Sequence, residues 1–214
     1  MRARSSPGDG PSTSAPSPPS AAAAAAAAAR WRVRLVTPRD AGAVAELQAA
    51  AFHEALPLPL LGDLAFASFR AEVRDALRQK MGALDDEAFV LLVAESDDGG
   101  GGPLGVIELT LLADADVLRH LPGSARYAYI SSMAVAAASR RRGMASALLD
   151  AAHARAAAWD QPVALHVYDD NATALACYRA AGYEEVARDP GWRKLVGGRV
   201  RVLMILRRPR SGSA

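Results

Sequence analysis

Hydrophobic and polar residues follow two periods along residues 31–207 of this 214-residue chain. Short segments in which apolar residues alternate or run together are typical of strands, and apolar spacing of three and four is typical of helices. The strand-like segments are 31–36, 89–96, 104–112, 126–135, 162–168, 183–188 and 199–206, and the helical ones are 37–52, 62–82, 142–159 and 171–182. Thr37 and Pro38 suit the N-cap and first position of the first helix. The order β-α-α-β-β-β-α-β-α-β-β predicts one α/β domain, a mixed sheet with helices on both faces.

The first 30 residues differ in composition from the rest. They are mainly Ser, Pro and Ala, with a run of nine alanines, three arginines and one acid. Such a segment buries too little apolar surface to offset its chain entropy, so we expect it to be disordered. An acid-poor composition with Arg and Ser is typical of an organelle transit peptide, and a low-complexity tail is the alternative. The folded domain is expected over 31–210, with a short tail at 211–214.

Charge and cysteine content narrow the class of protein. The formal net charge of +2 resides in the first 30 residues, so the folded part is neutral, which argues against a nucleic-acid partner. No apolar run reaches the ~18 residues that a membrane-spanning helix needs, so we expect no membrane partner. The single Cys177 permits no internal disulfide, which favours a reducing compartment. No histidine has metal-ligand spacing with another His or Cys, so we predict no metal.

The segment SRRRGMASALL at 139–149 joins a predicted strand to a predicted helix. A helix N-terminus presents unpaired N–H groups and partial positive charge, a glycine lets an anion approach them, and arginines add forked hydrogen bonds. Gly143, in the first turn, and the preceding Arg140, Arg141 and Arg142 therefore predict a pyrophosphate site. The segment lacks the GxxxxGK[ST] of a P-loop and the GxGxxG of a dinucleotide site. Taken alone, it could equally be a solvated helix start whose glycine serves packing.

A match of this segment to a known family pattern, together with two further motifs of the same family, favours the phosphate interpretation. RRRGMA fits the R/Q-x-x-G-x-G/A pattern of the GNAT superfamily of acyl-CoA-dependent N-acetyltransferases, and YISSMAV at 129–135 resembles that family's fourth strand. NATALACYRAAGY at 171–183 resembles its N-x-x-A-x-x-x-Y-x-x-x-G-[FY] signature. The motifs occur in the family's order, and the resemblance covers about residues 31–207. It implies the GNAT fold, with a mixed, mostly antiparallel sheet that splays between its fourth and fifth strands.

The resemblance also implies acetyl-CoA as co-substrate and assigns residues to its binding. The fourth strand would pair with the pantetheine arm through its backbone, and amides at the start of the next helix would hold the pyrophosphate. Asn171 would hydrogen-bond the pantetheine arm, and Tyr178 would face the sulfur. The implied coenzyme-binding residues are Met133, Ala134, Val135, Arg140, Arg141, Arg142, Gly143, Met144, Ala145, Ser146, Asn171, Ala172, Thr173 and Tyr178.

Acetyl transfer to an amine needs a polarised thioester carbonyl, a proton acceptor and a stabilised thiolate. Backbone N–H groups near Val135 are expected to polarise the carbonyl, and Tyr178 is the candidate acid. Proton transfer from a phenol to a thiolate, both of ordinary pKa, is uphill by about 2 kcal/mol, so we expect Tyr178 to stabilise the thiolate by hydrogen bonding. An ordinary aromatic residue on a helix face is the alternative for Tyr178.

Tyr129 and His166 are the candidates for the base, because they lie on the two strands that, in this family, separate around the acyl group. Catalytic subunits of eukaryotic protein N-terminal acetyltransferases have a similar Tyr and His at matching places, working through ordered water. Glu108 on the third strand is the alternative base, and His166 could instead be a structural strand histidine. Strand alternation does not settle the direction of Tyr129, because a bulge would shift it.

The choice of acceptor follows from amine acidity. An α-amine titrates at about 7.7–8.0 and lysine at about 10.4, so a weak base suffices for protein N-termini. We therefore expect N-termini as acceptors, lysines as secondary ones, and direct attack in a ternary complex. An acceptor pocket is expected from HEALPLPLLGD at 53–63 and DPGWRKLVGG at 189–198, with Trp192 facing apolar peptide side chains. A small-molecule amine acetyltransferase and a non-catalytic acyl-CoA sensor are the alternatives.

Together with the transit-like N-terminus, the chain resembles the plastid GNAT acetyltransferases of plants and algae, which act on protein N-termini and lysines. That resemblance implies the plastid stroma, with the mitochondrion or the cytoplasm as alternatives. A monomer is favoured as the oligomeric state.

Overall fold

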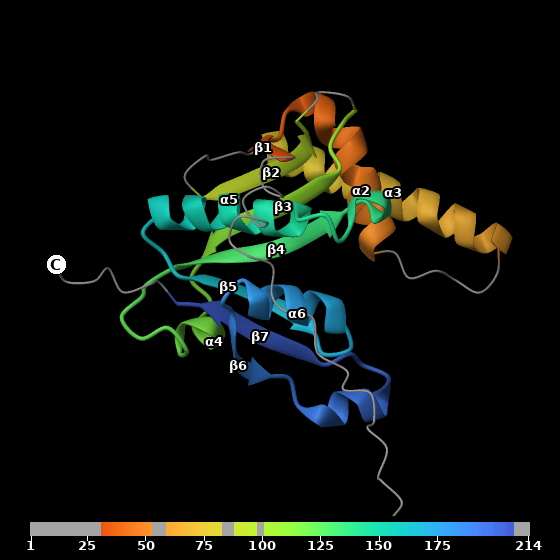
Figure 1. Ribbon diagram of the computed structural model, residues 1–214. Coiled ribbons are helices and arrows are strands. Elements are labelled where there is room, and N and C mark those ends of the chain that lie inside the picture. The colour runs from red at the N-terminus through yellow and green to blue at the C-terminus, as the bar shows by residue number, and fades with distance from the viewer. Residues whose placement is uncertain (1–30, 53–58, 83–87, 98–100, 208–214) are drawn as a thin grey trace, which may run out of the picture.

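The computed structural model describes residues 31–52, 59–82, 88–97 and 101–207. Figure 1 shows one sheet with helices packed against both of its sides. The strands are β1 (Trp31–Leu35), β2 (Phe89–Ser96), β3 (Gly105–Leu112), β4 (Tyr127–Val135), β5 (Val163–Tyr168), β6 (Glu184–Arg188) and β7 (Arg201–Leu206). The helices are α2 (Ala41–Phe52), α3 (Pro59–Gly82), α4 (Ala115–Leu118), α5 (Met144–Ala158) and α6 (Ala172–Ala180), with 3-10 turns η1 (Pro38–Asp40), η2 (Ala137–Ser139) and η3 (Gly191–Val196).

The elements follow the order expected from the hydrophobic periods, with one addition. The short helix α4 lies between β3 and β4, where no helix was predicted. Within the described residues, no helix is long and apolar enough to cross a membrane. The predicted N-terminal segment 1–30 and the tail 211–214 lie outside the described residues.

The seven strands form a mixed sheet in the order β1-β2-β3-β4-β5-β7-β6. Neighbouring strands are antiparallel except β4 and β5, which run parallel. The parallel pair arises because α5 carries the chain back from the end of β4 to the start of β5, as parallel strands require. The predicted mixed, mostly antiparallel sheet is confirmed.

β4 and β5 are paired only over their first halves. Ala128 to Ile130 pair with Val163 to Leu165, and the pairing ends there, although β4 continues to Val135. Next to this point the β3–β4 register shifts, so that Ser131 is an extra residue in β4. Such a bulge bends its strand and increases the local twist. The two strands therefore splay apart where the sequence resemblance placed the gap.

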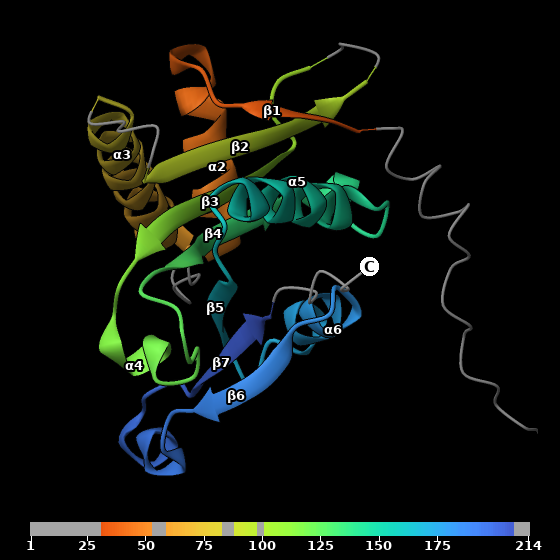
Figure 2. The same ribbon diagram turned by 90° about the vertical axis from the view of Figure 1, so that its left-hand side faces the viewer.

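Helices cover both faces of the sheet (Figure 2). On one face α5 and α6 pack on the main apolar core, in which Leu148 of α5 and Leu175 of α6 join Ile107 and Leu165 of the sheet. On the opposite face α2 and α3 pack on a second cluster. A third cluster lies on that same face, where Val117 of α4 packs with Tyr127 of β4 and Leu203 of β7. Burial of these side chains supplies the main stabilisation of the fold.

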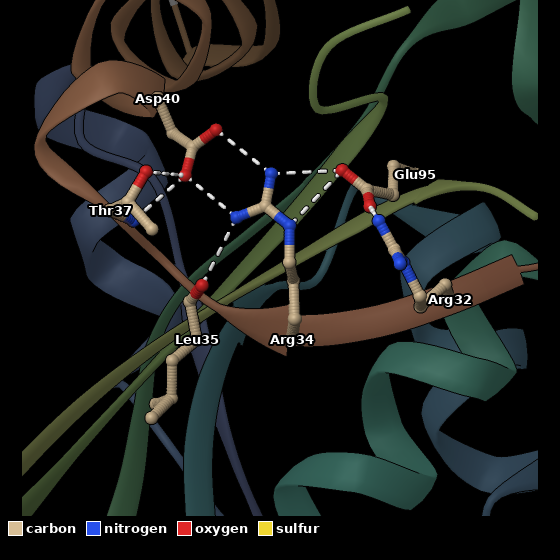
Figure 3. Close-up of polar contacts among 6 residues, drawn as sticks. All are labelled: Arg32, Arg34, Leu35, Thr37, Asp40 and Glu95. Carbon is tan, nitrogen blue, oxygen red and sulfur yellow. Dashed lines mark hydrogen bonds and ion pairs between the residues drawn. The ribbon is translucent and has the colours of Figure 1, made fainter. Parts of the chain in front are cut away.

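The entry to α2 is tied to the edge of the sheet by ion pairs around Arg34 (Figure 3). Thr37 is the N-cap, as predicted, and it forms a capping box with Asp40, in which the Thr37 N–H donates to Asp40 Oδ2 at 2.7 Å. Arg34 Nη1 donates to Asp40 at 2.7 Å, and Arg34 Nη2 donates to Glu95 at 2.8 Å; Arg32 also pairs with Glu95. The Arg34 hydrogen bond is the main cause that lowers the pKa of Asp40 to about 2. This cluster lies at the end of the sheet remote from the gap.

Candidate active site

The turn between β4 and α5 has the backbone geometry of an anion site. Arg141 and Gly143 are both left-handed, with φ of 61° and 85°. Left-handed residues within such a turn direct successive N–H groups to one side. Gly143 is the N-cap of α5 and no side chain caps the helix, so the first-turn N–H groups remain available for an anion. The helix therefore begins at Met144. The prediction that it began at residue 142, with Gly143 inside its first turn, is wrong by two residues.

Trp31 in β1 and the end of β4 hold two arginines of this turn. Its Nε1 donates to the Arg142 carbonyl at 2.9 Å, and the Arg142 guanidinium lies 5.5 Å from the indole ring. Arg140 Nε donates to the Val135 carbonyl at 3.1 Å, which ties the turn to the end of β4. All three arginines are exposed to solvent. No local signal in the sequence marks Trp31, because its partner lies 111 residues away.

The end of β4 has one paired and one open edge. Met133, Ala134 and Val135 pair with β3, while none of the described strands pairs with their other edge. Main-chain N–H and C=O groups on an open edge can accept an added strand. An extended chain with amide groups, such as pantetheine, therefore fits this edge in the way the resemblance implies.

The start of α6 lies on the same face of the sheet as α5. Asn171 is its N-cap, and its Oδ1 accepts a hydrogen bond from the Ala174 N–H at 3.1 Å. Asn171, Ala172 and Thr173 are exposed. The amide group of Asn171 is thus positioned by the cap, and its Nδ2 can still donate to a ligand.

Tyr178 lies further along α6 and is 8% exposed. Its ring packs edge-on against Tyr183, with 5.6 Å between the ring centroids. Burial raises the pKa of the Tyr178 phenol, and the nearby Cys177 and Tyr129 add to the increase. The hydroxyl therefore keeps its proton at any physiological pH and can act as a hydrogen-bond donor.

Tyr129 and His166 meet on the opposite face of the sheet. The Tyr129 hydroxyl lies 3.1 Å from His166 Nδ1, and the ring centroids are 5.9 Å apart. Burial and the positive charge of Arg201 lower the pKa of His166. The imidazole is consequently neutral at pH 7 and above, which leaves a nitrogen lone pair to accept a proton. Burial raises the pKa of Tyr129, so this phenol is also protonated.

A cavity of about 610 Å³ opens beside this pair. Asp114 and Val117 of the α4 region form one wall, and Arg201 of β7 forms another. From the predicted pocket segment at 189–198, only Asp189 and Pro190 line the cavity; Trp192 is 59% exposed and does not, contrary to expectation. Residues 53–58 of the other predicted pocket segment lie outside the described residues. The wall from α4 had no sequence signal, because four helical residues show no period.

Glu108 occupies a different environment from the Tyr–His pair. It is 4% exposed, and its Oε1 accepts from Lys80 Nζ at 2.6 Å and Ser131 Oγ at 2.7 Å. It lines a separate cavity of about 350 Å³ under α3, where Gln48 Nε2 donates to Ser132 Oγ at 2.9 Å. Glu108 thereby holds the bulge that opens the gap. As an ion-paired carboxylate outside the larger cavity, it is a weaker candidate for the base than His166.

No group of three or more His, Cys, Asp or Glu side chains in the described part of the chain could hold a metal ion. The site consists of a turn with the backbone geometry of an anion site on one face, a Tyr–His pair on the other, and a gap between parallel strands that joins them. A sheet of this topology with a site at such a gap defines the class of GNAT acyltransferases.

Residues 46–183 match the acetyltransferase (GNAT) family, and the chain belongs to it. It is 36% identical over 184 residues to GCN5-related N-acetyltransferase 10, chloroplastic, of Arabidopsis thaliana, which covers 81% of this chain and 71% of that protein. The predicted family, fold and acetyl-CoA-dependent N-acetyltransferase activity are confirmed.

Solved structures with the same fold include two complexes with acetyl-CoA or CoA. Arabidopsis thaliana NAA60 in complex with acetyl-CoA is 19% identical, with a TM-score of 0.60 and coverage of 82% of this chain and 97% of that one. A chain of the NatC complex bound to Gag peptide and CoA is 16% identical, with a TM-score of 0.59 and coverage of 83% and 98%. At these identities the similarity establishes the fold alone.

Proposed function

We propose that the protein transfers acetyl from acetyl-CoA to amino groups of other proteins, N-terminal α-amines first and lysine side chains second. The observation that carries the proposal is the contact between Tyr129 and His166 at 3.1 Å, in a cavity on the face opposite the Gly143 turn. A coenzyme on one face and an acceptor on the other would meet at the gap between β4 and β5. NAA60 and the peptide-bound NatC chain share this fold, which supports a polypeptide acceptor.

The coenzyme is proposed to bind along β4, α5 and α6. Amides from Arg141 to Ser146 hold the pyrophosphate, because Gly143 leaves the start of α5 uncapped. The open edge at Met133–Val135 pairs with the pantetheine arm, and Asn171 donates to it. Bound there, acetyl-CoA supplies the activated acetyl group.

His166 is proposed to take the proton from the acceptor amine, directly or through a water held with Tyr129. Its neutral state supports this role, because burial and Arg201 keep its pKa below the ordinary value. A base of this strength suffices for an α-amine, about half of which is already neutral near pH 8. A lysine amine is mostly charged at that pH, so we expect slower transfer to lysine.

Tyr178 is proposed to stabilise the departing thiolate. Its place in the core on the α5–α6 side of the sheet supports this role, and its raised pKa favours hydrogen bonding over loss of the proton. The two tyrosines thus act on different groups: Tyr129 helps to position the water or amine at His166, and Tyr178 donates a hydrogen bond to the leaving thiolate.

The proposal is tested by comparing acceptors at equal concentration with the purified full chain and acetyl-CoA. The acceptors are a peptide with a free N-terminus, the same peptide blocked at its N-terminus but containing lysine, spermidine and tryptamine. We expect kcat/KM to be highest for the free N-terminus, lower for the lysine peptide and lowest for the small amines. If a small amine is acetylated fastest, the protein acceptor is wrong; if acetyl-CoA binds without turnover of any of them, the protein is a sensor.

Residues 1–30 are proposed to direct the protein to the plastid stroma. The support is their transit-like composition and the chloroplastic name of the Arabidopsis relative. A fluorescent fusion of the full chain in plant cells should accumulate in plastids, and one that lacks residues 1–30 should not. Accumulation of the full-chain fusion in mitochondria or cytoplasm would contradict this location.

A further inference from the structure

The end of α6 couples Tyr178 to a second tyrosine. Gly182 is left-handed, with φ of 89°; its N–H donates to the Arg179 carbonyl at 3.0 Å, and the Tyr183 N–H donates to the Tyr178 carbonyl at 3.0 Å. These two bonds are those of a Schellman motif, in which the residue after the glycine packs on the residue that begins the last turn. The Tyr183 ring accordingly lies edge-on to the Tyr178 ring, at an interplanar angle of 64°. The position of Tyr178 therefore depends on that of Tyr183.

Tyr183 is itself fixed by a residue of α5, the neighbouring helix on the same face (Figure 2). Its hydroxyl lies 2.9 Å from His153 Nε2, and the two ring centroids are 5.5 Å apart. Tyr183 is 3% exposed, and a buried hydroxyl left without a partner is costly. Burial lowers the pKa of His153, so the neutral imidazole can accept this hydrogen bond at pH 7 to 8. His153 thus determines where the Tyr183 ring lies.

The hydroxyl of Tyr178 makes no hydrogen bond to another side chain of the described residues, so packing of its ring determines where it points. We propose that His153 is a positioning residue for acetyl transfer: through the Tyr183 hydroxyl it holds the Tyr178 ring so that the Tyr178 hydroxyl is directed at the departing thiolate. The inference rests on the role proposed for Tyr178. His153 lies in α5, outside the signature that contains both tyrosines.

A positioning role differs from ordinary packing in how the substitutions combine. If His153 and Tyr183 act through the Tyr178 hydroxyl, their loss lowers kcat only while that hydroxyl is present. If His153 and Tyr183 only stabilise the fold, their loss lowers the melting temperature. Any effect on kcat is then the same whether or not the Tyr178 hydroxyl is present. Steady-state kinetics of the full chain with acetyl-CoA and a free N-terminal peptide separate these cases.

We expect Tyr183→Phe and His153→Leu each to lower kcat about tenfold, the size of effect that a small misplacement of a catalytic group produces. KM for acetyl-CoA should change less than about twofold, since neither residue belongs to the proposed coenzyme contacts. His153→Gln, which retains a hydrogen-bonding group, should recover most of the rate. In a Tyr178→Phe background neither substitution should lower kcat further. Val93→Ala, buried in the cluster on the opposite face, should lower the melting temperature and leave kcat unchanged.

Two results would overturn the inference and leave the proposed function intact. One is a wild-type kcat for Tyr183→Phe and His153→Leu; the other is an equal reduction in the presence and absence of the Tyr178 hydroxyl. A Tyr178→Phe protein as fast as wild type would instead remove the role of Tyr178 itself, and the inference with it.

Discussion

The face of the sheet covered by α5 and α6 and the face covered by α2, α3 and α4 meet where β4 and β5 separate, but they are built differently. On the first face the proposed coenzyme-binding groups come from two stretches, 133–146 and 171–183, and are largely backbone groups at a strand edge and at helix starts. On the second face, side chains from distant segments converge, with Tyr129 and His166 separated by 37 residues. The proposed coenzyme face is thus local and built mainly from the backbone, and the proposed acceptor face is built from side chains that only the tertiary fold brings together.

This difference determines how a substitution should act on each face. A coenzyme site made of amides tolerates side-chain changes but not a change in backbone conformation. In an acceptor site made of charged and aromatic side chains, a substitution should act by changing the pKa of neighbouring groups and therefore the pH dependence of the rate. The predictions below test that contrast, from the largest effect on catalysis to the smallest.

Tyr178→Phe should reduce kcat about a hundredfold, because it removes the donor to the leaving thiolate, and KM for acetyl-CoA should change little. Tyr168→Phe is the matched control, since Tyr168 is an exposed tyrosine stacked on Arg199 at the end of β5. Steady-state rates with a peptide acceptor measure both. Equal rates for the two variants would show that Tyr178 is an ordinary helix-face aromatic.

Gly143→Val should weaken acetyl-CoA binding about thirtyfold, or 2 kcal/mol, because a β-branched residue resists the left-handed conformation and the amides lose their alignment. Gly123 has the same φ of 85° and open space around it, so Gly123→Val carries the same backbone strain away from the site. Calorimetric titration with acetyl-CoA should show a normal Kd for the Gly123 variant. Similar losses in both would attribute the effect to strain alone.

Arg201→Gln should raise the pKa of His166, because it removes a positive charge that lowers this pKa. It also removes one of the two arginine partners of Asp189, which keeps Arg193, and the negative charge of Asp189 raises the pKa of His166. The protonated imidazole cannot accept a proton, so kcat/KM near pH 6 should fall about threefold relative to wild type and recover above pH 7.5.

NMR titration of the His166 ring measures this shift directly. Arg199→Gln, which removes a nearby arginine paired with Asp170, is the control and should leave the titration unchanged. An unchanged or lower pKa in the Arg201 variant would contradict the electrostatic account of the acceptor face.

Arg34→Met should leave the kinetics unchanged and lower stability by about 2 kcal/mol, because Asp40 and Glu95 are buried and would lose their main partner. The Asp40 contribution has a definite pH dependence: its pKa is lowered to about 2 in the folded protein, below the ordinary value near 3.9. The stabilisation is therefore present above about pH 4 and is lost as the pH falls towards 2. Urea unfolding of the wild type and the Arg34→Met variant between pH 3 and 7 should show a difference in the free energy of unfolding that becomes smaller as the pH approaches 3.

Only part of the proposed coenzyme face could be predicted from local signals. Gly143 lies at a helix start, a position that is read from neighbours in the chain, whereas the roles of Asn171 and Tyr178 were inferred through the family resemblance. Even there, the start of α5 was placed at 142 instead of Met144, because helix propensity does not distinguish a left-handed N-cap glycine from a first-turn one.

The acceptor face depends on contacts that no local pattern contains. The direction of Tyr129 depends on where the β4 bulge falls, and Ser131 is set there by Glu108 from the neighbouring strand. The α4 wall and the Arg201–Asp189 pair also arise only on folding. Tyr129 and His166 themselves were predicted through a family resemblance, and their mutual contact needed the structure.

The most direct test of the two-face arrangement is a crystal structure of the protein with CoA covalently joined, through an acetyl bridge, to the N-terminus of a short peptide. We predict the pyrophosphate on the amides around Gly143 and the bridge passing between β4 and β5 beyond Ile130. The peptide should lie in the cavity beside Tyr129 and His166, with its amide nitrogen near that pair. A peptide on the α5–α6 face, or an amide nitrogen remote from Tyr129 and His166, would contradict the account.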